Sequence, residues 1–390
     1  MEALDPHDDN CGRLVARFHA SPAQLVLAAT GGAAGAIAAL LSTPGGSRTV
    51  LECVVPYSAA ALAEFLGRAP ERYCSEATAR AMAMVAFERA RRLGAEWRRA
   101  IGLGVTASLA SDRPKHGDHR LHVATQSAAA TVVASLTLIK GRRSRAEEET
   151  LAAAFTLNQL AASAGVTERM PLDLDGAEQV IFARHDAAPT WQSLWSGEAR
   201  AIPVSGDDAR PKVVFSGAFH PVHRGHRRIA QIGGQLLGAP AAWELPIVNA
   251  DKPPLDYLEV AGRLAQFEPG AKVWLTRAAT FVEKADLFPG ATFLVGVDTI
   301  LRIDDPRFYA HSALARDAAF ERIAAAGCRF LVFGRVRRAA GDAGAATFYT
   351  LSQLELSPGL QALCDETSAV VFREDVSSTS LRSGIADEWT

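Results

Sequence analysis

Short runs of consecutive apolar residues alternate along the chain with longer segments in which apolar residues recur every three or four positions. The short runs are typical of buried strands, and the longer segments are typical of helices with one buried face. In the first part of the chain this pattern predicts strands at 24–29, 50–55, 100–105 and 130–138, and helices at 32–41, 75–93 and 145–162. Such alternation indicates a mixed or parallel sheet that is covered by helices.

The second part of the chain repeats the alternation. It predicts strands at 212–215, 243–248, 272–276, 292–297, 329–333 and 369–372, and helices at 224–237, 257–266, 313–326 and 351–364. Strands and helices of these lengths imply right-handed crossover connections and a Rossmann-like, doubly wound parallel sheet. Ligands of such sheets bind outside the carboxyl ends of the strands. The residues that directly follow each strand are therefore the first place to look for a site.

The pattern divides the chain into two α/β domains, at residues 1–165 and 211–390. Residues 166–210 between them are rich in polar and turn-forming residues. Their two short apolar runs, 180–183 and 201–204, predict a linker with a small hairpin of its own. A chain of 390 residues has room for two such cores.

Net charge, the length of apolar runs and cysteine spacing each exclude some classes of binding partner or site. The formal net charge is −2, which gives no electrostatic reason to expect nucleic acid or an anionic membrane as a partner. No apolar run reaches about 18 residues, so we expect no membrane span. The five cysteines are scattered without a CxxC pair. This usage is typical of reduced thiols in the cytoplasm rather than of disulfides or a zinc site.

A cluster of histidines and glycines follows the first strand of the second domain. Residues 213–226 read VVFSGAFHPVHRGH. His223 and His226 are three residues apart and therefore share one face of the first helical turn. Gly225 between them has no Cβ atom, so an anion can approach the backbone, and Gly217 lets the chain leave the strand in close packing. Two imidazoles, free amide groups and the positive end of a helix thus converge on one point, which favours phosphate binding.

This segment resembles the GxFxPxHxGH signature of the HxGH nucleotidyltransferase superfamily, which includes nicotinate and nicotinamide mononucleotide adenylyltransferases, phosphopantetheine adenylyltransferase and cytidylyltransferases. Residue type, spacing and the strand-to-helix context all agree. Two other interpretations stay open. The histidines can belong to a loop that only caps a helix, or His220, His223 and His226 can form a zinc site. The residues that match the signature are Gly217, Phe219, Pro221, His223, Gly225 and His226.

A second match to the same superfamily lies near the C-terminus. Residues 376–382 read VSSTSLR, which resembles an ISSTxxR motif at the start of a late helix. The resemblance implies that Ser377, Ser378 and Thr379 bind the β- and γ-phosphates and that Arg382 neutralises their charge. Taken alone, the run of hydroxyl residues is also a common helix N-cap.

Two further residues follow predicted strands. Asp298 ends a G-V-D sequence similar to the superfamily's GxD strand end, where the acid meets the ribose or the acceptor. A role as a helix cap is equally open for Asp298. Lys252 follows the second strand of the domain, where acceptor-phosphate contacts lie in the superfamily.

The resemblance implies transfer of an adenylyl group from ATP to a small phosphorylated acceptor, with release of pyrophosphate. The acceptor phosphate attacks the α-phosphorus in line, and the protein positions two anions and stabilises the added charge of the transition state. Mg²⁺ enters with ATP, bound to phosphate oxygens and water, and no metal site made by the protein is expected. His223, His226 and Arg382 are then the catalytic residues. The residues expected to bind the substrates are Gly217, Phe219, Gly225, Ser377, Ser378, Thr379, Asp298 and Lys252.

The first domain resembles the C-terminal domain of the CinA (competence/damage-inducible) family, whose active members deamidate nicotinamide mononucleotide. Several sequence pieces occur in the family's order. They are Thr30-Gly31-Gly32, Pro44-Gly45-Gly46, and the segments 54–58, 75–83 and 102–106.

The catalytic residues of that family have no counterparts here. The family's E-S-C-T-G-G loop carries a nucleophilic serine, whereas residues 27–32 read LAATGG, so Ala28 stands at the serine position. Leu62 stands where the family has a lysine, five residues after a tyrosine that corresponds to Tyr57. A nucleophile needs an oxygen or sulfur and an activating base, so we expect no amidohydrolase activity. The domain then binds a ligand through Thr30-Gly31-Gly32, mediates homo-oligomerisation or serves as a scaffold; a tight turn that opens a helix is the simpler interpretation of that tripeptide.

Together the two resemblances favour an enzyme similar to nicotinate or nicotinamide mononucleotide adenylyltransferases. The choice of acceptor rests only on the association with a CinA-like domain. The alternatives are a cytidylyltransferase, an adenylyltransferase for another phosphorylated acceptor, and a non-catalytic nucleotide sensor in which neither domain turns over its ligand.

Overall fold

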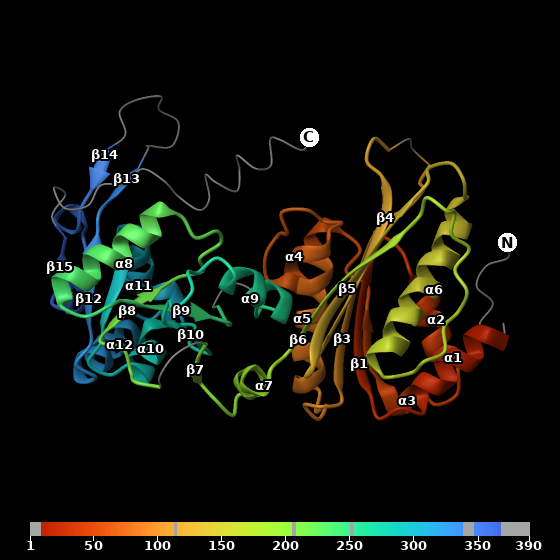
Figure 1. The fold of residues 1–390 in the computed structure, drawn as a ribbon, viewed down its shortest axis with the longest axis horizontal. Coiled ribbons are helices and arrows are strands. Elements are labelled where there is room, and N and C mark those ends of the chain that lie inside the picture. Colours follow the sequence, from red (N-terminus) through yellow and green to blue (C-terminus); the bar gives the residue numbers. More distant parts are fainter. Residues whose placement is uncertain (1–8, 113–114, 205–207, 250–252, 338–346, 368–390) are drawn as a thin grey trace. The chain divides into compact units, whose positions relative to one another are not determined.

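A computed structural model describes residues 9–112, 115–204, 208–249, 253–337 and 347–367. The chain divides into two compact units (Figure 1). The first unit contains residues 1–196 together with 251–261, and the second contains residues 197–250 together with 262–390. Both units are α/β structures, as the sequence predicts.

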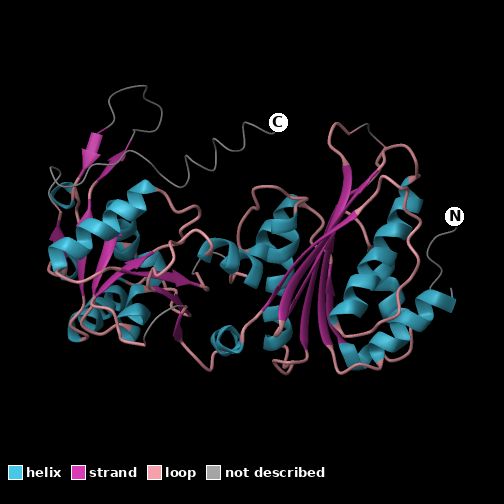
Figure 2. Ribbon diagram, in the orientation of Figure 1, coloured by secondary structure: helices cyan, strands magenta, loops and turns pink. Residues whose placement is uncertain are grey.

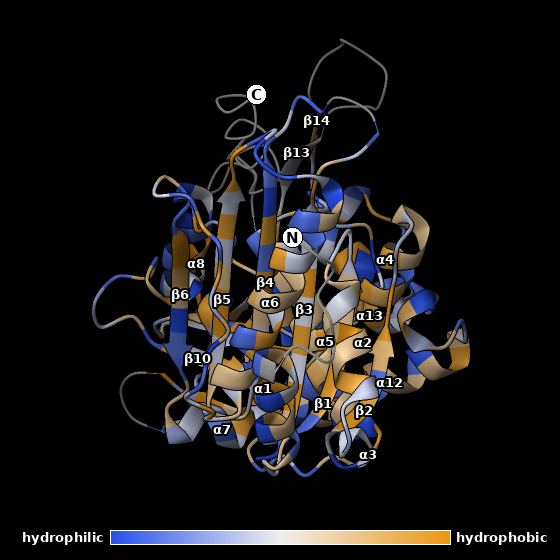
Figure 3. Cartoon of the chain, turned by 90° about the vertical axis from the view of Figure 1, so that its right-hand side faces the viewer, coloured by the Kyte–Doolittle hydropathy of each residue, from blue (hydrophilic) through white to orange (hydrophobic). Residues whose placement is uncertain are grey.

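The first unit is built on a six-stranded mixed sheet in the order β2-β1-β3-β4-β5-β6. β1 pairs in parallel with β2 and β3, and the remaining neighbours are antiparallel. In Figure 3 the strand β1, which lies between β2 and β3, is mostly hydrophobic, in keeping with its burial. The strands are β1 (Gln24–Thr30), β2 (Val50–Val54), β3 (Ala100–Ser108), β4 (His119–Ser127), β5 (Ala130–Leu138) and β6 (Val180–Asp186).

Helices cover both faces of this sheet (Figure 2). Along β3, Ile101, Leu103 and Val105 join the core that α1, α2 and α6 form on one face. Gly102 and Gly104 point to the opposite face, where a Cβ atom would collide with the backbone of α5, so these glycines let α5 lie directly on the sheet. The helices are α1 (Asp9–His19), α2 (Ala34–Ser42), α3 (Gly46–Thr49), α4 (Ala59–Leu66), α5 (Glu76–Arg92), α6 (Arg145–Ser163) and α7 (Pro189–Ser196).

The segment that follows α6 is held to the first unit by buried polar contacts. The side-chain amide of Asn158 donates to Met170 O (2.9 Å), and its oxygen accepts from Met170 N–H (2.8 Å). Arg143 forms a bidentate pair with Glu178 (2.7 and 2.8 Å), and both side chains are buried. Glu178 also accepts from the N–H groups of Ile139 and Asp175. Both carboxylate oxygens of Glu178 thus have donor partners, as burial of this charge requires.

The hairpin predicted between 180–183 and 201–204 is wrong. β6 extends the first sheet by pairing with β5, and β7 (Ala201–Pro203) pairs with β10 of the second sheet. Each strand completes the edge of a larger sheet, where it buries more apolar surface than an isolated hairpin can.

Residues 253–261 belong to the first unit although they lie in sequence between two strands of the second sheet. Arg80 of α5 donates to both oxygens of Asp256 at 2.8 Å. Tyr257, which begins α9 (Tyr257–Leu264), is fully buried; its hydroxyl donates to Ala128 O (3.0 Å), and its N–H donates to the hydroxyl of Thr131 (3.0 Å). This segment is therefore an integral part of the first unit.

The second unit contains a seven-stranded sheet in the order β15-β12-β11-β8-β9-β10-β7. All neighbouring strands are parallel except the edge strand β7, so the predicted doubly wound sheet is confirmed. The chain runs outward from β8 to β10 and returns to β11 on the other side of β8, which puts the topological switch point between β8 and β11. The strands are β8 (Val213–Ser216), β9 (Ala242–Pro246), β10 (Val273–Thr276), β11 (Thr292–Gly296), β12 (Arg329–Phe333) and β15 (Cys364–Glu366), with a separate pair β13 (Arg335–Arg337) and β14 (Thr347–Tyr349).

Neighbouring residues of β11 pack against opposite layers. Leu294 lies under α8 (Arg224–Leu237), where a Cβ atom on Gly233 would meet the leucine side chain at 2.5 Å. Phe293 points the other way, into a core that contains Phe288, Ile300 and Phe320. That core is formed by α10 (Phe281–Leu287), α11 (Val297–Asp304), α12 (Ala313–Ala325) and α13 (Pro358–Gln361).

The long helix predicted at 351–364 is wrong. The structure has a 3-10 turn at Leu351–Gln353, the short helix α13 and the strand β15. Pro358 explains the break, because proline disfavours a helical conformation at the residue before it and removes a backbone donor. Cys364 then pairs with Phe330 at the edge of the sheet. The strand predicted at 369–372 lies outside the described residues. No helix in the described ranges has the length and apolarity that a membrane crossing requires.

Candidate functional site

The histidine segment leaves the carboxyl end of β8 and enters α8. Phe219 anchors the intervening loop, because its ring is only 2% exposed and packs edge-on against Phe215, Trp243 and Phe267. The backbone of Phe219 is left-handed (φ 47°), a conformation that costs a non-glycine residue about 1–3 kcal/mol and here is held by this packing. Phe219, predicted to bind substrate, thus lies in the core beneath the loop.

The two glycines of the signature have packing roles. A Cβ atom on Gly217 would lie 2.8 Å from the ring of Phe219, so glycine is needed for that ring to fold back under the strand end. The N–H of Gly217 donates to Glu244 O (3.1 Å), which ties the start of the loop to β9. Gly225 is buried in the first turn of α8.

The structure brings His223 and His226 together. Their rings stack with centroids 3.7 Å apart and planes inclined by 22°. His223 is the N-cap residue of α8, and the edge of the His226 ring lies against Phe219 with the centroids 5.3 Å apart. Both imidazoles are half-buried. The predicted shared face is therefore present, at the positive end of a 14-residue helix.

One hydrogen bond determines which nitrogen of His226 carries its proton. The backbone N–H of His223 donates to Nδ1 of His226 (3.3 Å), so Nδ1 is an acceptor and has no hydrogen. In the neutral imidazole the hydrogen then lies on Nε2, which can donate to a phosphate oxygen.

Two side chains from beyond the motif hold the loop. Gln266 accepts from the N–H of Val222 (2.8 Å), and Arg263 donates to Ala218 O (2.9 Å). Arg227 in the first turn of α8 donates to Gln266 O (3.4 Å). The motif gives no signal for Gln266, which lies 44 residues from the residue that it binds.

Replacing Gln266 with alanine is expected to loosen the loop while the fold is kept. A single hydrogen bond of this kind contributes about 0.5–1.5 kcal/mol, which corresponds to roughly threefold to tenfold faster hydrogen exchange at Val222. Hydrogen–deuterium exchange of the peptide that contains Val222 measures this change. Gln235→Ala, at an exposed position of α8, is the matched control. Equal exchange in both variants would show that other contacts hold the loop.

The remaining predicted residues fall into two groups. Asp298 lies in the first turn of α11, directly after β11, so it follows the strand next to β8. The N-cap of that helix is Gly296, so Asp298 is the second residue of the helix and not its cap residue. Lys252, Ser377, Ser378, Thr379 and Arg382 lie outside the described residues. Among the residues that are described, no group of three or more histidine, cysteine, aspartate or glutamate side chains is arranged to hold a metal ion.

In the first unit, two apolar residues stand at the positions where the resemblance to the CinA family places a serine and a lysine. Ala28 and Leu62 are both buried and belong to one hydrophobic cluster with Leu66 and Met82. Leu62 also lines a pocket of about 300 Å³. Its lining includes Thr30, Gly31, Tyr57, Ser58, Leu62, Tyr73, Cys74 and Thr106.

The helix that follows Thr30-Gly31-Gly32 already holds an anion of the protein itself. The carboxylate of Glu149 accepts from the N–H of Ala34 (2.6 Å) and Gly35 (3.4 Å) at the start of α2. The amides that a bound phosphate would use are therefore occupied.

All five cysteines of the chain are free thiols.

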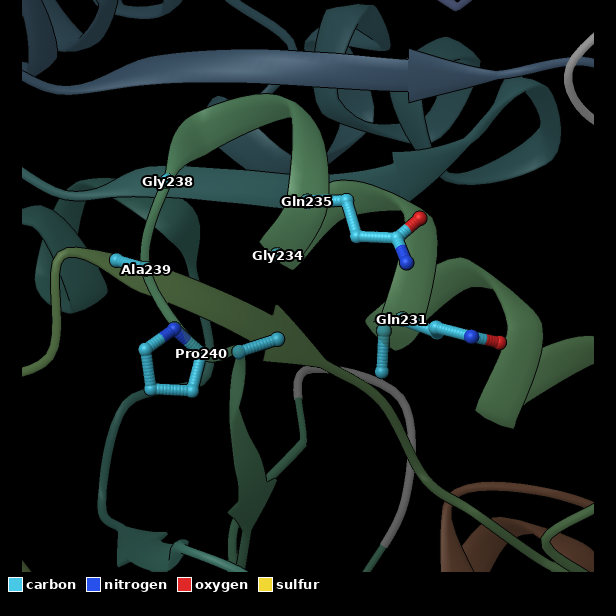
Figure 4. Close-up of a pocket in the computed structure, with 8 residues that line it drawn as sticks. Gln231, Gly234, Gln235, Gly238, Ala239 and Pro240 are labelled. Carbon is cyan, nitrogen blue, oxygen red and sulfur yellow. The ribbon is translucent and has the colours of Figure 1, made fainter.

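A second hollow lies away from the histidines. Figure 4 shows Gln231, Gln235 and Pro240 around it, on α8 and the turn that leads to β9. It is open, and its lining consists mainly of small residues at the carboxyl-terminal half of α8. The histidines lie in the first turn of the same helix, so this hollow is not part of the candidate site.

Comparison with known proteins finds no matching family model and no matching curated protein. Solved structures that resemble the chain include competence/damage-inducible protein CihA from Agrobacterium tumefaciens, with 21% identity and a TM-score of 0.33 over 42% of this chain and 98% of that one. A CinA superfamily protein from Escherichia coli has 21% identity and a TM-score of 0.29 over 39% of this chain and 87% of its own. One from Enterobacter cloacae has 17% identity and a TM-score of 0.34 over 42% and 98%. The chain is thus similar, over about two fifths of its length, to proteins of the CinA superfamily.

Proposed function

We propose that the second unit transfers an adenylyl group from ATP to a small phosphorylated acceptor and releases pyrophosphate. The observation that carries this proposal is the stacked pair His223 and His226 at the start of α8, at the carboxyl end of β8. This is the strand at the switch point of the sheet, next to β11 and Asp298. Donors and a helix end gathered there suit a substrate with several phosphates.

The chemistry requires positioning and charge stabilisation rather than a nucleophile of the protein. An oxygen of the acceptor phosphate attacks the α-phosphorus, the bond from that phosphorus to the β-bridging oxygen breaks, and pyrophosphate leaves with the electron pair. Nε2–H of His226 is the donor to a phosphate oxygen, and His223 stacks on it to fix its direction. Donors held in place before the reaction stabilise the transition state without reorganisation.

The other substrate contacts follow from the sequence resemblance. Ser377, Ser378 and Thr379 are proposed to bind the outer phosphates, Arg382 to neutralise their charge, and Lys252 to contact the acceptor phosphate. Mg²⁺ would arrive with ATP and keep mainly phosphate and water oxygens as ligands. Asp298, in the first turn after β11, is a carboxylate suited to such an ion or to the ribose hydroxyls.

The proposed acceptor is nicotinate or nicotinamide mononucleotide. Its support is the likeness of the first unit's sequence to a family that acts on pyridine mononucleotides, which is association rather than geometry. The first unit itself is proposed to lack amidohydrolase activity, because Ala28 and Leu62 fill the positions of the nucleophile and the lysine with apolar groups. It serves as a scaffold or as a homo-oligomer contact.

A pyrophosphate-release screen with Mg²⁺ tests the proposal on the full chain. It combines ATP and CTP, each in turn, with nicotinate mononucleotide, nicotinamide mononucleotide and phosphopantetheine. We expect release with ATP and a pyridine mononucleotide. Release only with CTP or with phosphopantetheine would move the assignment to another donor or acceptor. If no pair of substrates releases pyrophosphate while calorimetry shows that ATP binds, the result would favour the nucleotide sensor.

A further inference from the structure

We propose that Ser216 donates a hydrogen bond to a phosphate oxygen of the substrate, and that Lys284 and Glu244 are positioning residues that fix the direction of this donor. This inference rests on the proposed function, and it concerns residues outside both sequence motifs.

Ser216 is the last residue of β8 and the residue immediately before the histidine loop. It is partly exposed, in contrast to the three buried residues before it in the strand. Because ligands of a doubly wound sheet bind at the carboxyl ends of the strands around the switch point, Ser216 lies at the expected position of a substrate.

A buried cation, the ammonium group of Lys284, forms a hydrogen bond with the side chain of Ser216. Nζ of Lys284 in α10 donates to Ser216 Oγ (2.7 Å) and to Glu244 Oε2 (2.8 Å). Glu244 is fully buried, Lys284 is 3% exposed, and Thr276 donates to the second oxygen of Glu244. Ser216 and Glu244 are direct partners in the register of β8 and β9, so their side chains share the face of the sheet that α10 covers.

The chemistry of the ammonium group determines the role of the serine. An ammonium has three donors and no lone pair, so Ser216 Oγ can only accept in this bond. The single hydroxyl hydrogen of Ser216 is left for another acceptor, and none of the described residues accepts it. A hydroxyl that already accepts from a cation is also a stronger donor, because bonds in a chain polarise one another. The non-bridging oxygens of a phosphate are acceptors only and would match this donor.

A merely structural interpretation predicts something different. If Ser216 served only to accept the hydrogen bond from Lys284, removing its hydroxyl would change the stability of the fold but would not change substrate binding or turnover. Three full-length proteins separate the two cases: wild type, Ser216→Ala, and Ser216→Thr, which keeps the hydroxyl. Affinity for inorganic pyrophosphate by calorimetry and pyrophosphate release in the substrate screen are the two measurements.

For Ser216→Ala we expect binding of pyrophosphate to weaken roughly threefold to tenfold and turnover to fall by roughly 10²-fold, the effect of losing one prearranged donor. Ser216→Thr should recover most of both. Unchanged binding and turnover in Ser216→Ala would overturn the role of Ser216 while the transferase stands. If the wild type binds pyrophosphate without turnover, the proposed reaction fails and the binding comparison alone decides for or against Ser216. A wild type that neither binds nor turns over overturns both proposals.

The positioning role has its own test. Lys284→Met alone leaves Glu244 buried without its cation, which is strongly destabilising, so the variant of choice is Lys284→Met with Glu244→Gln. It keeps the Ser216 hydroxyl and removes the cation that orients it. We expect turnover as low as in Ser216→Ala, and little further loss when Ser216→Ala is added, because both changes remove one interaction. Losses that multiply in the triple variant would show that the ion pair acts independently of Ser216.

Discussion

Replacing His226 with alanine is expected to lower the rate of pyrophosphate release by roughly 10²–10³-fold, the range seen when one prearranged donor to developing charge is removed. The side chain is half-buried, and its Nδ1 is engaged by the N–H of His223. Its loss therefore removes the directed Nε2–H donor and also the ring on which His223 stacks. Steady-state kinetics with the pair found active in the screen measure the effect, and the unfolding midpoint reports whether the fold is kept.

A second histidine of the same unit provides the control. His311 is exposed and has a positive φ of 59°, so asparagine, which tolerates that conformation, is the suitable replacement. His311→Asn should retain wild-type turnover. Near-wild-type turnover in His226→Ala would remove the histidine pair from the chemistry and, with it, the main support for a nucleotidyltransferase.

Replacing Glu178 with alanine is expected to destabilise the first unit by about 3–5 kcal/mol, because Arg143 would stay buried without its counter-charge. The same change leaves the N–H groups of Ile139 and Asp175 without the carboxylate to which they now donate hydrogen bonds. Urea unfolding followed by circular dichroism measures the loss. Glu168→Ala is the control, because its ion pair with Arg17 is more than half exposed and pairs of that kind contribute little. Equal stability of the two variants would show that the segment 166–178 is held without this carboxylate.

The same carboxylate predicts a pH dependence. Hydrogen bonds from Arg143 lower the pKa of Glu178 from its usual 4.5 to about 2 in the folded protein. A carboxyl group with a depressed folded pKa contributes stability above its unfolded pKa and loses that contribution as pH falls through the folded value. The stability difference between wild type and Glu178→Gln should therefore be constant above about pH 5 and should shrink between pH 4.5 and 2. A difference that is independent of pH across that window would contradict the assigned ion pair.

Helices and strands with a strong periodic pattern could be predicted from the sequence. Strands that form because they pair with neighbouring strands could not. The strands β5 and β12 and the helix α8 have the predicted bounds, because an apolar run or a helical stripe marks each of them. The strand β4 was missed, since histidine, arginine and glutamine interrupt its apolar residues; it forms because antiparallel partners lie on both sides. Two of its polar side chains are buried in bonded pairs, His119 with Glu148 and Gln126 with Thr131.

The candidate site follows the same division. The pairing of His223 with His226 and their location between β8 and α8 are local consequences of spacing, so the sequence was sufficient to predict them. The groups that hold the site are distant in sequence. Gln266 binds Val222 from 44 residues away, and Lys284 binds Ser216 from 68 residues away. Only the sheet order brings β8, β9 and α10 together, and a lysine on an amphipathic helix is normally expected to face solvent.

The membership of residues 251–261 in the first unit means that the polypeptide passes between the two units three times. No single cut can therefore produce two complete halves. A fragment ending at residue 196 would keep Arg80 but lose both of its carboxylate partners, Asp256 and Glu259. A fragment beginning at residue 197 would contain Tyr257 but lack Ala128 and Thr131, the residues to which Tyr257 donates hydrogen bonds in the intact protein. Splitting the gene for this protein at one site would thus give products in which the first unit is incomplete or carries a stray piece of the second.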